Sequence, residues 1–315
     1  MPIFLPESHR NVYLFTMDIQ MYENWEEEQE HHEEKLQSVV IPYLEARSRG
    51  DRQPVTDFLF EYYSFRPGKL MRWNPGAGAR VSPSWSPPDH RYKKGNSGWF
   101  LDPADFPVKR MDSLQWLITF QKAILSKPPS YGCHGLHEWA MVYKSSAVRH
   151  NQLPLRLPMD ELVDFVDSQQ IRCSHYDAFR FFTDQARPSN HLQPEAGNRL
   201  QLEQSGCIHA NMDVYKWAYK FFPWIPSSII SDAFLLAAEA RQIDMQASPY
   251  DVRSYGLEPI QIETPEGRTH YLERQQYITI KASPIRERLL SALIELHQWV
   301  QPGTVAPQSQ DFRGV

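Results

Sequence analysis

The sequence has few of the features that would assign it to a common enzyme class. It contains no glycine-rich phosphate-binding loop, no GxSxG nucleophile motif, no HExxH motif and no zinc-finger spacing. No apolar run approaches the roughly 20 residues that span a bilayer. These absences argue against kinases, nucleotide-binding folds, nucleophile-elbow hydrolases and the common zinc proteases, and we expect no membrane partner.

Cysteine is scarce as well. The three cysteines, Cys133, Cys173 and Cys207, are an odd number at wide spacing and include no CxxC pair. They match neither a disulfide framework nor a cysteine-rich metal site. The first ten residues also lack the basic and then apolar pattern of a secretory signal. We therefore expect a reduced, cytoplasmic protein.

Charge is nearly balanced but unevenly distributed. The 33 Lys and Arg residues face 38 Asp and Glu residues, which gives a formal net charge of −5. Residues 23–34 contain seven glutamates and no Lys or Arg, whereas residues 61–110 contain nine basic and four acidic residues. The basic stretch also contains three tryptophans. Local patches set the field that a polyanion meets, so the acidic total does not exclude one.

Apolar periodicity predicts a mainly α protein with a single-domain, bundle-like fold over residues 23–300. We expect an N-terminal arm at 1–22, a frayed tail at 301–315, and a long ordered aromatic and basic loop at 66–110. At most a short strand pair is expected, with 258–267 as a short strand or turn. The expected helices span residues 24–49, 112–126, 135–146, 160–168, 174–186, 208–222, 228–243 and a last region ending near 299.

Three segments combine polar residues with helical apolar patterns: residues 132–143, 172–182 and 206–220. Each places a small residue or a cysteine just before a histidine, a carboxylate one to four residues later, and then aromatic residues. His209 and Asp213 are four residues apart and share a helix face. Because a buried carboxylate must be paired, hydrogen-bonded or protonated, the pattern indicates a pocket with perturbed carboxylates.

One interpretation is hydrolysis assisted by a carboxylate that acts as a general base or stabilises developing positive charge. Asp177 and Asp213 are the first candidates and Glu138 is the third. Aromatic side chains would stack on a flat substrate such as a nucleobase, and nearby cations would meet phosphate. The full candidate set comprises catalytic Asp177, Asp213, Glu138, His175, His209 and His137, and substrate-binding Trp139, Tyr215, Trp217, Arg180 and Lys216.

A second interpretation uses the same segments to bind one or two transition-metal ions, because helical bundles host carboxylate–histidine sites. The protein would then be an iron, manganese or zinc oxygenase or hydrolase acting on a small aromatic or nucleobase-like substrate. No cofactor is required by the sequence. The candidate metal ligands are His175, Asp177, His209, Asp213 and Glu138, with His137 or the pair His31 and Glu34 as additions.

The simplest interpretation is structural. Each histidine can cap the start of a helix, and each Asp–Arg or Asp–Lys pair three residues apart can be a solvated ion pair. The basic residues of 66–110 can belong to an ordered loop or to a surface that binds a nucleic-acid backbone. Under this interpretation the protein is a non-catalytic module that binds nucleic acid or another partner.

The three segments also carry a family resemblance. Together with residues 57–67, 154–157, 247–251 and 262–268, they resemble bacterial proteins, common in actinobacteria, that are labelled 3-methyladenine DNA glycosylase. The resemblance extends over roughly residues 25–296. It implies a DNA repair glycosylase that releases alkylated purines, with DNA as its partner, but it attaches no established catalytic residue to these motifs.

Overall fold

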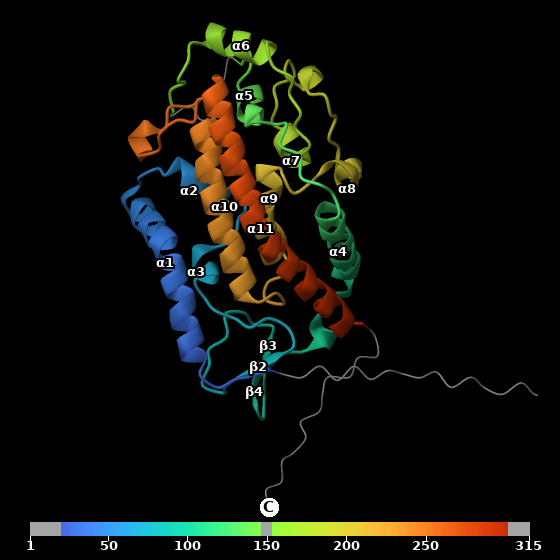
Figure 1. The fold of residues 1–315 in the computed structure, drawn as a ribbon. Helices are drawn as coiled ribbons and strands as arrows, with labels where there is room; N and C mark the ends of the chain where they lie inside the picture. Colours follow the sequence, from blue (N-terminus) through green and yellow to red (C-terminus); the bar gives the residue numbers. More distant parts are fainter. Residues whose placement is uncertain (1–19, 146–152, 302–315) are drawn as a thin grey trace, which may run out of the picture.

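The computed structural model describes residues 20–145 and 153–301 and shows a mainly α protein. Most of the predicted N-terminal arm and C-terminal tail lie outside the described residues. Two long helices, α10 (Ser227–Ala247) and α11 (Pro265–Trp299), run through the centre of the molecule (Figure 1), with α9 (Ile208–Tyr219) packed against both. Among the helices that the structure describes, none has the length and apolar character needed to cross a membrane.

The central helices are flanked by two others. Helix α1 (Trp25–Arg49) packs against α10, and α4 (Met111–Leu125) packs against α11 on the opposite side (Figure 1). Most side chains of α10 are buried, because this helix is covered by neighbours on several sides. Its alanines and leucines make this close packing sterically feasible.

Several helix boundaries agree with the sequence. Helix α1 begins after Asn24 and ends at Gly50, whose positive φ of 81° suits a left-handed C-cap. Pro42 lies inside this helix without ending it. Pro284 likewise lies inside α11, which ends at Trp299 as predicted. The aromatic stretch that periodicity left undecided contains a helix, α2 (Pro54–Glu61).

The segment 66–110 differs from the expected long loop. It contains α3 (Pro67–Leu70) and three strands, and the strands join β1 near the N-terminus in a four-stranded sheet of order β1-β2-β4-β3. The sheet replaces the expected strand pair. Its strands are β1 (Gln20–Tyr22), β2 (Ala79–Val81), β3 (Tyr92–Gly95) and β4 (Gly98–Leu101).

Strand pairing and aromatic packing explain why this segment is ordered. Strand β1 is parallel to β2, whereas β4 is antiparallel to β2 and to β3. Trp73 and Trp85 are buried, with their ring centroids 5.8 Å apart. Strands of three or four residues between prolines and glycines leave almost no alternating pattern, which is why the sheet was not predicted.

The remaining elements are short and lie mainly in the connections. The predicted helices at 135–146 and 174–186 are one-turn helices, because the chain turns soon after each begins. Residues 258–267 form no strand and lead through a turn into α11. The short helices are α5 (Leu136–Ala140), α6 (Met159–Asp167), α7 (Tyr176–Phe179), α8 (Arg199–Leu202) and the 3₁₀ turns Pro103–Asp105, Val108–Arg110, Arg187–Ser189, Ala196–Asn198 and Arg253–Tyr255.

The sheet and the polar segments lie at opposite ends of the molecule. Figure 1 shows the sheet at one end of α10 and helices α5, α6 and α7 at the other. At the first end, the backbone N–H of Ser227 donates to the carbonyl of Asn74. Asp244 lies 17 residues further along α10, about 25 Å away at 1.5 Å per helical residue. The helix therefore separates the sheet from the polar cluster described next.

Candidate metal centre and adjoining pocket

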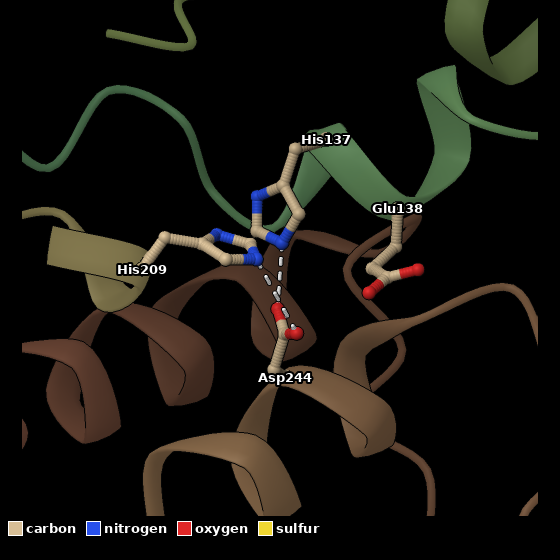
Figure 2. A group of neighbouring side chains, drawn as sticks. All are labelled: His137, Glu138, His209 and Asp244. Carbon is tan, nitrogen blue, oxygen red and sulfur yellow. Dashed lines mark hydrogen bonds and ion pairs between the residues drawn. The ribbon is translucent and has the colours of Figure 1, made fainter. Parts of the chain in front are cut away.

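Four side chains from three helices converge at the end of α10 remote from the sheet. Helix α5 contributes His137 and Glu138, α9 contributes His209, and α10 contributes Asp244. One ligand atom from each residue lies within 4.8 Å of the others. Figure 2 shows both imidazole rings directed at the Asp244 carboxylate, with Glu138 beside them. We call these four residues the histidine–carboxylate group.

Two interactions hold Asp244 against the histidines. Its Oδ1 lies 2.6 Å from His137 Nε2, and its Oδ2 lies 3.9 Å from His209 Nε2. The two imidazole rings meet edge to face, with their centroids 4.3 Å apart. Burial raises the pKa of Asp244, but the two histidines and Arg241 outweigh it and hold this pKa far below its usual range. The carboxylate is therefore ionised.

Arg241, one turn before Asp244, joins the two carboxylates of the group. Its Nη1 donates to Glu138 Oε1 at 2.8 Å and to Asp244 Oδ2 at 2.6 Å. Its side chain is 2% exposed, so these contacts operate away from solvent. The two carboxylates of the histidine–carboxylate group are thus paired with the Arg241 guanidinium, and Asp244 also contacts His137.

The two histidines of the group differ in their protonation. Burial lowers the pKa of His137, but Asp244 and Cys133 outweigh this effect and raise the pKa well above its usual value. For His209, burial and the neighbouring His137 lower the pKa well below its usual value. His209 is therefore a neutral imidazole, in which one ring nitrogen has a lone pair available to a cation.

The short helix α5 is positioned by the residues that precede it. Gly135 adopts a φ of 79° at the N-terminus of α5, and a Cβ there would lie 3.3 Å from the Ala247 side chain. Only glycine adopts this conformation and fits this gap readily. Cys133 Sγ lies 3.4 Å from His137 Nδ1, on the side of the ring away from Asp244. Each ring nitrogen of His137 thus has a partner, and the two contacts fix the orientation of the imidazole.

A second polar cluster begins one turn further along α9. Asp213 accepts from Tyr63 OH at 3.3 Å, and its Oδ2 lies 3.2 Å from His175 Nε2. Lys216 donates to both Asp213 and Asp177, the latter at 2.9 Å. Lys216, His175 and Tyr63 thus surround a carboxylate that is only 3% exposed.

Further cations complete this second cluster. Arg199 Nε donates to Glu203 Oε1 at 2.7 Å, and its Nη2 lies 3.4 Å from Asp177 Oδ2. Arg180, which is half exposed, lies 3.5 Å from the other Asp177 oxygen. Its three carboxylates therefore meet three cations. We call this set the ion-pair network: Asp177, Glu203, Asp213, Lys216, Arg199 and Arg180, with His175.

The network sets the protonation of its central residues. Burial raises the pKa of Asp213, but Lys216 and His175 outweigh it and hold the pKa far below its usual range. His175 caps α7: its Nδ1 accepts from the backbone N–H of Ala178 at 3.2 Å. Its Nε2 is consequently the protonated nitrogen, which donates to Asp213. Both nitrogens of His175 have partners, as expected for a structural histidine.

A pocket of about 310 Å³ joins the group and the network. Glu138 and His209 line it from the histidine–carboxylate group, and His175, Asp177 and Asp213 line it from the network. Apolar and aromatic side chains complete the wall, namely Pro54, Phe58, Tyr62, Tyr63, Met141 and Phe181. The three polar segments of the sequence thus meet at one pocket.

The aromatic residues predicted to stack on a substrate lie elsewhere. Trp139 and Tyr215 are fully buried, and the Trp139 indole donates to the Ala247 carbonyl at 2.9 Å. Trp217 packs against Phe120 and does not line the pocket. Trp139, Tyr215 and Trp217 are therefore buried positions of their helices. The pocket takes its aromatic wall from Phe58, Tyr62, Tyr63 and Phe181, which the sequence did not single out.

The predicted metal ligands separate into two sets. The compact group contains Glu138 and His209, together with His137, which was proposed as an additional ligand. His175, Asp177 and Asp213 belong instead to the ion-pair network. His31 and Glu34 lie on the exposed side of α1. Asp244 and Arg241 were missed, although an arginine and an aspartate three residues apart in a helix rich in alanine and leucine are a signal that could have found them.

Comparison of the chain with protein-family models, with curated proteins and with solved structures found no match. The resemblance to glycosylases therefore stays a prediction, and the functional argument depends on the geometry.

Proposed function

We propose that the protein is a transition-metal-dependent enzyme acting on a small planar substrate. The observation that carries the proposal is the convergence of His137, Glu138, His209 and Asp244, whose ligand atoms all lie within 4.8 Å of one another. Two imidazoles and two carboxylates are a ligand set that zinc, iron and manganese accept. His209 Nε2, His137 Nε2 and an Asp244 oxygen are the three primary ligands in this proposal.

The charge of the group supports a cation at this position. A metal ion takes the lone pair of a neutral imidazole, so binding would release the proton that the raised pKa of His137 retains in the metal-free group. Glu138 and Asp244 would then carry two negative charges, whereas Arg241 carries one positive charge. Uncompensated charge in the interior is costly. A divalent ion between the histidines and Asp244 would supply the missing charge, and it would replace the hydrogen bond between His137 and Asp244.

The surroundings of the group suit a metal centre. Ligating histidines usually donate their second ring nitrogen to a partner that fixes the ring. Cys133 Sγ, 3.4 Å from His137 Nδ1, fills that role here. Arg241 similarly orients the carboxylates of Glu138 and Asp244, because it donates a hydrogen bond to each. The ligands would therefore be held in place before the ion binds.

The pocket suggests the substrate class. A volume of about 310 Å³ is at the lower end of the range for small-molecule sites. Phe58 and Tyr62 stack with their centroids 4.8 Å apart, and Phe181 lines the same cavity. Such walls favour a flat aromatic or heteroaromatic molecule. A metal ion at Glu138 and His209 would activate water or oxygen at the edge of this pocket, as in a hydrolase or an oxygenase.

This chain's own residues would orient the substrate. Burial, and then the Asp213 charge, raise the pKa of Tyr62 to about 12, so its hydroxyl stays protonated and can donate to a substrate acceptor. Asp213 and His175 face the same cavity but are held by the network. We therefore assign Tyr62 to substrate orientation, and Asp213 and His175 to support of the pocket wall.

A DNA glycosylase is the second candidate, because Asp213 and Asp177 both line the pocket. In that mechanism one of these carboxylates would stabilise positive charge on the sugar of a flipped alkylated purine. The sheet, however, which carries Arg80, Lys93 and Lys94 of the basic segment, lies at the other end of α10, so these cations are not placed to hold DNA beside this pocket. The metal-dependent function is accordingly the one that the geometry favours.

Metal content tests the proposal. We expect protein purified without added metal and without an affinity tag to carry about one transition-metal ion per chain. His209→Gln should lose most of it, because the variant removes one ligand while keeping a polar side chain of similar size. His270→Gln, at an exposed position of α11, is the matched control and should keep the ion.

Two results would contradict the metal-dependent function. The first is folded protein that stays free of metal and takes up none of zinc, manganese or iron(II). The second is equal metal content in His209→Gln and the parent protein. Release of methylated purines from alkylated DNA by metal-free protein, abolished by Asp213→Asn, would favour the glycosylase instead. Salt-dependent DNA binding without turnover would favour a non-catalytic module.

A further inference from the structure

A second cavity, which shares no lining residue with the pocket beside the candidate metal centre, is basic and aromatic. It has a volume of about 520 Å³ and lies between α4, α9 and the turn that precedes α4. Trp116 projects from α4 and is 36% exposed, whereas Trp217 and Phe221 form the wall on and just after α9. Nothing in the proposed function uses this cavity.

Three cations that line the cavity lie over its aromatic wall. The Arg110 guanidinium lies 4.4 Å from the Phe221 ring centroid, and Lys220 Nζ lies 5.0 Å from that of Trp217. Arg199, which is 12% exposed, lies 5.3 Å from the same Trp217 ring. These contacts use the faces of the rings, but they neutralise no charge.

The cavity lacks carboxylates to match these cations. Among the described residues that line it, Asp112 is the single acidic one. Arg199 is paired with Glu203 and Asp177 behind the wall. Arg110 donates a hydrogen bond to the carbonyl of Lys220. Within the described residues, neither the Arg110 guanidinium nor the Lys220 ammonium forms an ion pair with a carboxylate; each lies over an aromatic ring. Two positive charges at the cavity therefore have no anionic partner.

The protonation of these residues agrees with a local excess of positive charge. Burial, followed by the charges of Lys216, Arg110 and Arg199, lowers the pKa of Lys220. Burial and then Arg91 lower the pKa of Arg110. A bound anion would relieve this repulsion at both residues.

We propose that this cavity binds a planar aromatic anion, of the chemical class of a nucleoside monophosphate or an aromatic carboxylate. The aromatic group would lie against Trp116 and Trp217, and the anionic group would meet Arg110 and Lys220. Aromatic stacking together with a paired charge is the combination that mononucleotide and aromatic-acid sites use. The site is separate from the histidine–carboxylate group and does not depend on a metal.

Binding measurements test this site directly. We expect isothermal titration at low salt to detect binding of adenosine 5′-monophosphate, of 1-naphthoate, or of both. Adenosine, which has the ring but no anion, and inorganic phosphate, which has the anion but no ring, should bind at least about tenfold more weakly, since a charge-assisted contact is worth about one power of ten in affinity. Comparison of the two aromatic anions identifies which class the site prefers.

Matched variants separate this cavity from the candidate metal centre. Lys220→Gln should weaken binding of the preferred anion about tenfold, and Trp116→Leu should weaken it by a similar factor. Lys122→Gln removes the same charge from an exposed position of α4 that does not line the cavity, so it should leave affinity unchanged. Circular dichroism and thermal unfolding check that each variant is folded.

The proposal is overturned if neither aromatic anion binds. It is also overturned if Lys220→Gln and Lys122→Gln bind the anion equally well, since an anion attracted to a metal ion or to net charge would not distinguish them. Because metal content is measured independently, loss of the metal from His209→Gln with unchanged anion binding would leave both proposals standing.

Discussion

The histidine–carboxylate group and the ion-pair network are one helical turn apart on α9, yet their charges are balanced differently. Around Asp213, the three carboxylates of the network meet Lys216, Arg199 and Arg180. Around His209, two carboxylates meet Arg241 and His137, and the pKa of His137 is raised by Asp244. Residues of both the group and the network line the pocket. The kind of cation distinguishes them, because a histidine can exchange its proton for a metal ion whereas the lysine and arginines of the network cannot. We infer that a metal ion therefore has a place at the histidine–carboxylate group and not at the network.

The largest effect should come from removing a cation of the network. Lys216→Met leaves Asp213 and Asp177 short of a partner inside the protein, and we expect a loss of about 3–5 kcal/mol in the free energy of unfolding. Urea denaturation measures it, with Lys122→Met as the surface control. Added zinc or manganese should stabilise Lys216→Met only as much as it stabilises the parent protein, because the histidine–carboxylate group is intact in both; a larger gain in the variant would mean that the network also binds metal.

Arg241→Met applies the same test to the histidine–carboxylate group. In metal-free protein it should cost about as much as Lys216→Met, because Glu138 and Asp244 lose their shared guanidinium. A divalent ion at 100 times its dissociation constant should then return about 2.7 kcal/mol. At one fixed metal concentration, the ion should stabilise Arg241→Met more than it stabilises Lys216→Met, because loss of the guanidinium leaves the ligand carboxylates more negative; equal stabilisation would mean that the two clusters do not differ as we infer.

A third prediction concerns pH. The pKa of Asp213 is depressed in the folded protein, so the unfolded chain binds its proton first as pH falls. The stability from ionised Asp213 is therefore fully present above the unfolded carboxyl pKa of about 4 and is lost progressively below it. Asp213→Asn removes this contribution and should cost about 2–3 kcal/mol near pH 7.

Urea midpoints between pH 3 and pH 7 provide the measurement for Asp213→Asn. The difference between parent and variant should narrow as the pH falls below about 4. Asp184→Asn, at a side chain that is 99% exposed, should show no such narrowing. A constant difference across this range would show that the Asp213 charge contributes nothing specific to the fold.

The smallest predicted effect concerns the residue behind His137. Cys133→Ala removes the sulfur next to His137 Nδ1, and loss of such an outer partner lowers metal affinity about tenfold. Competition with a chromophoric chelator measures it. Cys207→Ala is the control, because Cys207 is a buried thiol without a hydrogen bond to a histidine side chain of the group. Equal metal affinities in Cys133→Ala and Cys207→Ala would show that Cys133 does not support the metal centre.

The sequence predicted the mainly α fold, and three of the four residues of the group were among its candidates. His137, Glu138 and His209 follow cysteine or glycine at helix starts, so local pattern was sufficient to find them. Asp244 lies in α10, where alanines and leucines predict a buried helix. Only tertiary packing brings this aspartate to His209. The sheet escaped prediction for a related reason, since its short strands depend on pairing with distant segments.

The central claim is a metal ion between His137, His209 and Asp244, and anomalous diffraction from a crystal of the protein with its native metal tests it most directly. We predict one strong anomalous peak within about 2.0–2.2 Å of both histidine Nε2 atoms and an Asp244 oxygen, with Glu138 as the fourth ligand or at the open side. A metal-free group, with His137 hydrogen-bonded to Asp244 in protein that was supplied with metal, would contradict the account.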